Sequence, residues 1–488
     1  SLLKTGQDQT GQVWPLFFSM GGGRPPFYIY AAIPFVALFG PTALAARAVS
    51  VLSGLGVAIM LYLICLKLFS KRTAIYAAIL AVITPWELSL SRGAFESHLA
   101  LFLGLLGLYV FLKGKEKSIW YIISALCFTL SMQTYSTYIL TVPLFVIMLT
   151  LSQGVRLLKP AMMIFLGLIL ASLLFSAYIS YSRGPKDRFY NLQIFSRPDL
   201  QSQLASKVKT ERAYSFLGPE LAEKFHNRVL ATLSVLTENY TNNFGLGFLF
   251  LQGDRNPRHN PPLSGQLFWF CLPLLIMGAV SLHKNHRKVF LFIFSWALIA
   301  PIAGSLVGEP HALRNSFLLP PLLIFTSLGI PKSLKLKLIL TAILLIQLPF
   351  FINRFYFLSP NLNAKFWSYS AKYAAETALD NKNKYDFIIL STSIPDMEFA
   401  YPVYAKIDPG KVINQNSHKS FIGEFSFSKF DNVYLGSVPS GAVRDFTRGL
   451  KGSVLYLGPL EDIGKVDGEG IQRDENESSL FVISQKQS

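Results

Sequence analysis

The stretch ALAARAVSVLSGLGVAIMLYLICL, residues 43–66, decides the class of this protein. Only a helix or a closed barrel satisfies its backbone hydrogen bonds inside hydrocarbon, and a helix of about 20 apolar residues is long enough to cross a bilayer. The rest of the chain has the same character. Of its 488 residues 51% are hydrophobic and 15% are charged, and the mean hydropathy is +0.39, so the chain is more apolar than a typical soluble protein.

Nine more apolar runs follow this stretch along the chain. The sequence predicts membrane helices at residues 43–66, 74–90, 96–112, 119–134, 137–152, 160–180, 265–282, 289–307, 313–330 and 334–352. The expected fold class is therefore a polytopic α-helical membrane protein with about ten spans and a small C-terminal α/β domain.

The loops between these runs alternate in charge. Basic side chains gather after the first, third, fifth, seventh and ninth runs, and short basic loops of a membrane protein lie on the cytoplasmic side. The same distribution explains the net charge of +17 and excludes nucleic acid as the expected partner. The basic-loop residues are Lys67, Lys71, Arg72, Lys113, Lys115, Lys117, Arg156, Lys159, His283, Lys284, Arg287, Lys288, Lys332, Lys335 and Lys337.

Three longer segments must then lie on the outer face, and a plain channel or carrier has no need of them. We expect a partial first outer loop with an interfacial segment at residues 1–42. A transmembrane domain with the outer loop 181–264 is expected at residues 43–352, and an extracytoplasmic α/β domain at residues 353–488. The chain starts at Ser1 with neither Met nor an apolar signal segment, so we expect a fragment that lacks an upstream span.

The region after residue 353 is expected to contain one helix and several strands. Residues 363–380 have a helical pattern, whereas residues 385–392, 432–438, 453–457 and 479–484 are short β-rich runs between Gly, Pro, Asn and Asp. The three cysteines of the chain, Cys65, Cys127 and Cys271, all lie in apolar runs without metal-type spacing. We interpret them as buried small hydrophobic residues and expect no disulfide.

Ionisable side chains at the outer ends of the spans are the candidate site residues, because polar groups near the bilayer are costly and tend to be functional. Arg24 stands between a glycine stretch and Pro25-Pro26, where its guanidinium either binds a lipid phosphate or simply snorkels to the interface. Glu96 and His98 begin an apolar helix. A carboxylate there can hold a metal ion or take a proton from an acceptor hydroxyl, although the helix dipole and Arg92 also explain Glu96 structurally.

Two later loops supply the remaining candidates. His311 and Arg314 are three residues apart, so they share a helical face and together can hold a phosphate; a turn capped by Glu309 is the structural alternative. Arg258 and His259 lie in the long outer loop, where they either contact the acceptor or the sugar or belong to a solvated turn.

Five stretches in this order carry a family resemblance: Ser1–Gly11, Arg24-Pro25-Pro26, Ser91–Glu96, Gly253–His259 and Pro310–Arg314. Together they resemble bacterial glycosyltransferases of the GT-C superfamily, in the branch related to protein O-mannosyltransferases and the lipid A aminoarabinose transferase. The resemblance implies about a dozen spans, a site in an outer cavity at the membrane surface, and a polyprenyl-monophosphate sugar as the donor.

The resemblance also assigns roles. Arg24 would meet the donor phosphate, Glu96 would be the acidic group of the second outer loop, and His311 and Arg314 would be the polar pair late in the membrane domain. The catalytic Asp of the family lies just upstream of the segment that resembles Ser1–Gly11, so it is expected ahead of Ser1. Asp8 lies on the wrong side of that segment to replace it.

These expectations combine into one hypothesis. The protein would be an inverting transferase in the bacterial cytoplasmic (inner) membrane, moving a sugar from a polyprenyl-phosphate donor to a protein, lipid or glycan acceptor on the outer face. Glu96 would orient the acceptor or hold a divalent metal ion, an open option for which no firm ligand cluster is visible. A flippase, which would want ionisable residues deep inside the spans, and an envelope ligase or acyltransferase with the same cavity are the alternatives.

Overall fold

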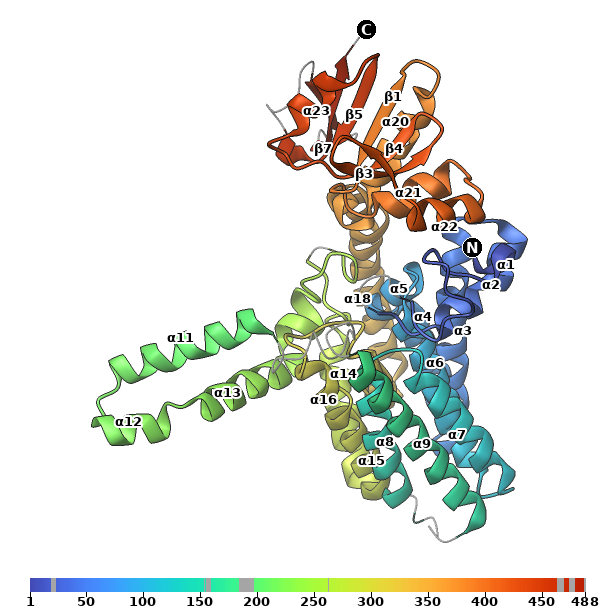
Figure 1. Ribbon diagram of the computed structural model, residues 1–488. Helices are drawn as coiled ribbons and strands as arrows, with labels where there is room; N and C mark the ends of the chain where they lie inside the picture. The colour runs from blue at the N-terminus through green and yellow to red at the C-terminus, as the bar shows by residue number, and fades with distance from the viewer. Residues whose placement is uncertain are drawn as a thin grey trace. The chain divides into compact units, whose positions relative to one another are not determined.

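The computed structural model divides into two compact units, one formed by Leu16–Phe351 and the other by Ser1–Pro15 with Ile352–Ser488 (Figure 1). It describes residues 1–18, 23–152, 154, 159–183, 197–261, 263–462, 469–473 and 479–486. Gly21 and Gly22 of the glycine stretch, Arg156 of a basic loop and residues 184–196 of the long loop lie outside the described residues.

The unit Leu16–Phe351 is helical, and each of the ten apolar runs of the sequence overlaps a helix, although the run 265–282 starts six residues before α14. Proline divides two of the runs: α4 ends before Thr84-Pro85 and α15 ends before Pro301, because proline cannot continue the hydrogen-bond ladder of a preceding helix. The helices are α2 (Phe27–Phe39), α3 (Ala43–Leu68), α4 (Lys71–Ile83), α5 (Pro85–Arg92), α6 (Glu96–Lys113), α7 (Ile119–Met132), α8 (Tyr138–Ser152), α9 (Pro160–Arg183), α11 (Pro198–Tyr214), α12 (Pro219–Phe225), α13 (Arg228–Thr241), η3 (Asn242–Phe244), η4 (Gly247–Leu251), α14 (Cys271–Asn285), α15 (Arg287–Ile299), α16 (Ile302–Ser305), η5 (Ser316–Leu318), α17 (Leu319–Gly329) and α18 (Leu334–Ile352).

The structure does not confirm the number of spans that the sequence predicts. Within the described residues, five helical segments are long and apolar enough to cross a membrane: α3, α6, α9, α15 with α16, and α18 with its continuation. Helices α4 and α5, bent by 54°, add a sixth if they count as one span. Helices such as α7 and α8, with 14 and 15 residues, are shorter than the roughly 20 residues that a straight span requires, so a count of about ten is not confirmed.

Close contact between α14 and α17 depends on two glycines. A Cβ atom on Gly278 would lie 1.8 Å from the carbonyl oxygen of Phe325, and one on Gly329 would lie 1.9 Å from the carbonyl oxygen of Leu274. Small residues allow helix backbones to approach in this way. Such contacts stabilise helix pairs in membranes, where the hydrophobic effect does not drive helices together because the lipid tails are themselves apolar.

Replacing Gly278 with alanine is therefore expected to lower the thermal stability of the protein. The added methyl group meets backbone atoms, so the two helices must separate, and overpacking of this kind costs about 1–3 kcal/mol. Gly167 of α9 is the matched control, because a Cβ atom there meets nothing within 4 Å. Thermal unfolding in detergent should show a lower midpoint for Gly278→Ala than for Gly167→Ala. Equal midpoints would contradict the packing role.

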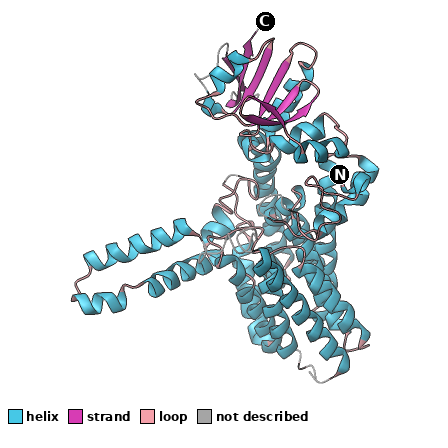
Figure 2. Ribbon diagram, in the orientation of Figure 1, coloured by secondary structure: helices cyan, strands magenta, loops and turns pink. Residues whose placement is uncertain are grey.

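The second unit contains the sheet of the protein, drawn in magenta in Figure 2. Its seven strands have the order β2-β3-β4-β1-β5-β7-β6; β1 pairs in parallel with β4 and β5, and the other pairs are antiparallel. This confirms the small α/β domain, and β2, β3 and β6 were not predicted. The elements are α1 (Leu2–Thr5), η6 (Asn353–Leu358), α19 (Ser359–Leu362), η7 (Ala364–Trp367), α20 (Tyr369–Asp380), β1 (Phe387–Ser391), α21 (Met397–Tyr404), α22 (Pro409–Ser417), β2 (Ser420–Ile422), β3 (Phe425–Phe430), β4 (Val433–Gly436), α23 (Val443–Gly449), β5 (Val454–Gly458), η8 (Leu460–Asp462), β6 (Glu469–Arg473) and β7 (Ser479–Lys486).

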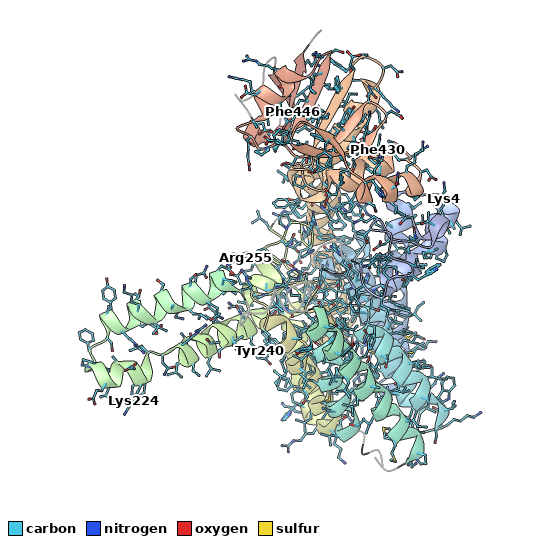
Figure 3. All side chains as sticks on the ribbon, viewed as in Figure 1. Lys4, Lys224, Tyr240, Arg255, Phe430 and Phe446 are labelled. Atoms are coloured by element: carbon cyan, nitrogen blue, oxygen red, sulfur yellow. The ribbon has the colours of Figure 1, made fainter. Side chains whose placement is uncertain are left out.

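Two apolar cores cover the two faces of this sheet. One includes Ile388, Phe430 and the alanine face of α20, and Phe446 of α23 packs against the other; Figure 3 labels both phenylalanines. Strand β1 is apolar throughout because, as a central parallel strand, it is buried on both faces. The segment Ser1–Pro15 joins this unit through the hydrogen bond from Asn416 Nδ2 to the carbonyl oxygen of Gln9, 3.1 Å long.

Candidate active site

The start of α6 carries the first polar group. Helix α6 begins at Glu96, where the helix dipole favours a negative charge. Arg24 comes from a short bridge in which its backbone exchanges both hydrogen bonds with Phe18. The distance from Arg24 Nη1 to Glu96 Oε1 is 2.5 Å, and the two side chains are 32% and 11% exposed. Two stretches that are 72 residues apart in sequence thus form one ion pair.

The guanidinium of Arg24 retains an unfilled donor. Its Nε–H group is buried and has no hydrogen-bond partner among the described residues. A buried donor without a partner costs about 1–3 kcal/mol, so each such group in a folded protein requires an explanation. A ligand oxygen supplies one, and phosphate is the anion whose oxygens best match the fork of a guanidinium.

A second pair of polar side chains joins helix α6 to α5. His98 pairs with Glu87 of α5 at 2.6 Å between Nε2 and Oε1, and both side chains are almost completely buried. Gly54 of α3 makes room for the pair, since a Cβ atom there would lie 3.0 Å from His98 Cε1 and 2.4 Å from Ser91 Oγ. His98 is therefore fixed inside the helix bundle, two residues along α6 from Glu96.

The third group is built around Asp254 in the loop after η4. Its Oδ2 atom accepts hydrogen bonds from His259 Nδ1 at 2.9 Å and from the backbone N–H of Ala312 at 2.7 Å. Its Oδ1 atom accepts a hydrogen bond from the backbone N–H of Asn256 at 2.8 Å, and this bond closes a local turn. His311 Nδ1 lies 3.8 Å from the same carboxylate. Asp254 thus holds the loops 252–261 and 308–315 together.

Asp254 is ionised in this environment. Burial by itself raises the pKa of its carboxyl group, but the hydrogen bond from His259 opposes this effect. The charges of His311 and His259 and the backbone N–H of Asn256 act in the same direction, so the pKa of Asp254 is lowered from its ordinary value. Asp254 is therefore a buried, charged carboxylate next to two imidazole rings.

Asp254, His259 and His311 also have the composition of a metal site. One ligand atom from each lies within 4.8 Å of the others, and the two imidazole rings are 4.5 Å apart between centroids. An ion at His311 Nδ1 would have to replace the hydrogen bond that this nitrogen accepts from the backbone N–H of Arg314 at 3.4 Å. Two nitrogens and one carboxylate oxygen are a ligand set that suits zinc and related divalent ions.

A cavity of about 690 Å³ opens beside this group. Its wall includes Asp254, His311 and Arg314, together with Arg197 at the start of α11. Arg255, labelled in Figure 3, and Glu309 form an ion pair at the wall, with a shortest N–O distance of 2.6 Å. Their side chains are 83% and 59% exposed, so this pair contributes little to stability. The wall of the cavity carries three arginines and three carboxylates, so it offers groups of both signs beside the Asp254, His259 and His311 group.

Two aromatic residues connect the groups. Phe95, which immediately precedes Glu96, packs edge-on against His259 at 5.4 Å between centroids. Trp86, which immediately precedes Glu87, donates its Nε1–H to the carbonyl oxygen of Ala312 at 3.0 Å. The stretches around residues 87–98, 254–260 and 311–314 consequently meet in space.

The predicted residues divide between these groups. Arg24 and Glu96 form one ion pair, while His311 and Arg314 line the cavity. His259 lies behind Asp254, and Arg258 is exposed next to it. Sequence reasoning did not single out Glu87 or Asp254 as site residues. The available signal for Glu87 was an acidic residue inside an apolar run, which is expensive unless it has a role.

The part of the chain that carries Arg24, Glu96 and His98 matches a known family. Residues 23–181, about one third of the chain, match the family described as dolichyl-phosphate-mannose-protein mannosyltransferase. No curated protein has a matching sequence.

Solved structures provide a second comparison. The fold is similar to that of ArnT from Cupriavidus metallidurans bound to undecaprenyl phosphate, with 13% identity, 99% of this chain and 91% of that chain covered, and a TM-score of 0.53. The Archaeoglobus fulgidus oligosaccharyltransferase in complex with Zn and sulfate is 16% identical, with a TM-score of 0.43 and 78% of this chain covered. The chain spans about half the length of that archaeal enzyme, 53%.

Proposed function

We propose that this chain, which belongs to the GT-C superfamily of membrane glycosyltransferases, moves a sugar from a polyprenyl-monophosphate donor to a hydroxyl or amine acceptor. The proposed place of action is the outer face of the bacterial cytoplasmic membrane. Superfamily membership is supported by the match of residues 23–181 and by the fold similarity to ArnT. The undecaprenyl phosphate bound to ArnT supports the choice of lipid carrier.

One observation carries this proposal: a buried Arg24 Nε–H group that has no partner in the described part of the chain and is held beside Glu96 at the start of α6. In sugar transfer, the acceptor oxygen or nitrogen attacks the anomeric carbon, and the bond from that carbon to the phosphate oxygen breaks. Negative charge then develops on the departing phosphate, and a positioned guanidinium lowers the energy of that state. Glu96 keeps the side chain of Arg24 in place for this contact.

The cavity residues belong to the same proposal. His311 and Arg314, which line the cavity, would bind an anionic part of a substrate. Arg258 and His259, which belong to the adjoining loop, would contact the acceptor or the sugar. A divalent ion is a proposed cofactor, because Asp254, His259 and His311 fit its ligand requirements. When bound, such an ion supplies positive charge that polarises a phosphoryl or hydroxyl oxygen.

A donor assay tests the function. The full-length protein, including the residues ahead of Ser1 where the catalytic Asp is expected, is reconstituted in lipid nanodiscs with an envelope extract as acceptor. It is expected to release free polyprenyl phosphate from a polyprenyl-phosphate sugar. Added undecaprenyl phosphate should compete with the donor, whereas the uncharged alcohol undecaprenol should not, because it lacks the group that Arg24 would bind. Transfer from nucleotide sugars without a lipid phosphate would overturn the proposal, and so would equal competition by phosphate and alcohol.

A further inference from the structure

Helices α11, α12 and α13 form a hairpin that projects from the helical unit (Figures 1 and 2). Lys207 Nζ of α11 donates to Ser234 Oγ of α13 at 3.3 Å, and Arg228 bonds to Gln201 across the same gap. At the far end, Arg212 Nε donates to the carbonyl oxygen of His226 at 2.7 Å. The hairpin is thus an internally bonded element, and its outer surface requires its own explanation.

That surface is unusually apolar. At the far end, Tyr214 is 82% exposed and Phe225 is 60% exposed, and Phe216 between them is fully exposed. On α13, Val229 and Leu233 are 68% and 52% exposed. Aromatic and aliphatic side chains gathered on one element in this way mark a surface that contacts something other than water.

The apolar residues of α13 form one stripe. Val229, Leu233, Leu236 and Tyr240 follow a spacing of four, three and four residues, which places them on a single helical face. We call this set the α13 stripe. Tyr240, labelled in Figure 3 at the base of the hairpin, donates its hydroxyl to the carbonyl oxygen of Leu298 at 2.9 Å. The stripe therefore ends at α15.

The point of contact on α15 is on the lipid side of that helix. Leu291, Phe294 and Leu298 are three to four residues apart, are all exposed, and belong to a segment apolar enough to span a membrane. In a helix that spans the membrane, the exposed apolar face that these residues form contacts acyl chains. Because Tyr240 touches Leu298, the α13 stripe continues the lipid-facing surface of α15 onto the hairpin.

The orientation and charge of the hairpin agree with this continuity. Figure 1 shows it running crosswise to α8, α9 and α15, as a helix lying on a membrane surface would. Between residues 207 and 228, its far half, the hairpin has five basic and three acidic side chains, whereas residues 198–241 as a whole have five of each. A preference for anionic head groups is therefore confined to the far half. Lysine and arginine beside exposed aromatic residues are typical of interfacial helices.

We propose that the hairpin α11–α13 lies in the interface of the bilayer, with the α13 stripe toward the acyl chains and the basic side chains at the lipid phosphates. The occupant of this surface is the lipid bilayer itself. The proposal does not depend on the proposed sugar transfer, since it concerns a different surface and requires no substrate.

Two neighbouring positions provide the test. Leu233 and Ser234 are both exposed in the protein alone, but only Leu233 belongs to the α13 stripe. Spin labels attached to Leu233→Cys and Ser234→Cys would be compared in liposomes that contain anionic lipid, by power saturation with lipid-soluble oxygen and with a water-soluble nickel complex. The native Cys65, Cys127 and Cys271 are buried, and the unsubstituted protein controls for their labelling.

The label at position 233 is expected to have a severalfold higher ratio of oxygen to nickel accessibility than the label at position 234. Equal, nickel-dominated values at both positions would overturn the proposal and leave a soluble partner as the occupant of the stripe. In Leu233→Glu, a label at Phe216→Cys is expected to become more accessible to nickel, since a charge on the stripe lifts the hairpin. No change at position 216 would count against a shared membrane contact.

Discussion

Replacing Arg24 with alanine is expected to lower sugar transfer by about 100- to 1,000-fold, the usual cost of removing one donor that stabilises developing negative charge. Binding of undecaprenyl phosphate should weaken in parallel, because the variant lacks the guanidinium and its unfilled Nε–H group. Arg24→Lys should recover only part of the loss, since an ammonium group keeps the charge but cannot present two parallel donors. Transfer rates and lipid-phosphate affinity in nanodiscs give both quantities.

The ion pair with Glu96 complicates this experiment and also provides its control. Arg24→Ala leaves the Glu96 carboxylate, only 11% exposed, without its partner, and part of any loss could then be lost stability. The double variant Arg24→Met with Glu96→Gln removes both charges, so it should regain the melting temperature without regaining transfer. Lys67→Met breaks a surface ion pair with Glu116 and should leave transfer unchanged. Restored transfer in the double variant would remove Arg24 from the donor site.

The second large effect concerns the Asp254, His259 and His311 group. The purified protein is expected to bind about one zinc ion per chain, and His311→Ala is expected to weaken that binding by more than the roughly 10- to 100-fold that loss of an outer-shell partner costs. Chelation should lower the melting temperature of the wild-type protein, because an ion that binds only the folded state stabilises it. Calorimetric titration and elemental analysis measure affinity and stoichiometry directly.

A matched histidine makes this result specific. His226 also lies beside a carboxylate, with Nδ1 3.4 Å from Glu211, but it belongs to the hairpin and has no second imidazole nearby that would complete a ligand set. His226→Ala should therefore keep the full zinc content. Loss of zinc in Glu96→Gln, with His311→Ala unaffected, would instead place the ion at the start of α6. Absence of zinc in the wild-type protein would reject the site.

Much of the architecture was determined by the sequence alone. All ten apolar runs overlap helices, and the four predicted strands correspond to β1, β4, β5 and β7. Hydropathy is a local property, so a run of apolar residues specifies a helix in lipid whatever its neighbours are. The number of membrane spans could not be predicted from the sequence, because helices such as α7 and α8 are too short for a straight crossing. The length of a helix in the folded chain depends on where a proline or the packing of its neighbours ends it.

The candidate site was determined only by the tertiary structure. The sequence predicted Arg24, Glu96, His259 and His311 as members of separate motifs. It did not predict that Arg24 pairs with Glu96 or that Asp254 joins two loops. The place of Glu87 inside an apolar run was a signal in the sequence, but its partner His98 came only from the structure. Each of these contacts joins residues whose proximity cannot be predicted from their spacing in the sequence. Local patterns encode burial and helix formation, whereas the pairing of distant charges depends on how packed helices bring their ends together.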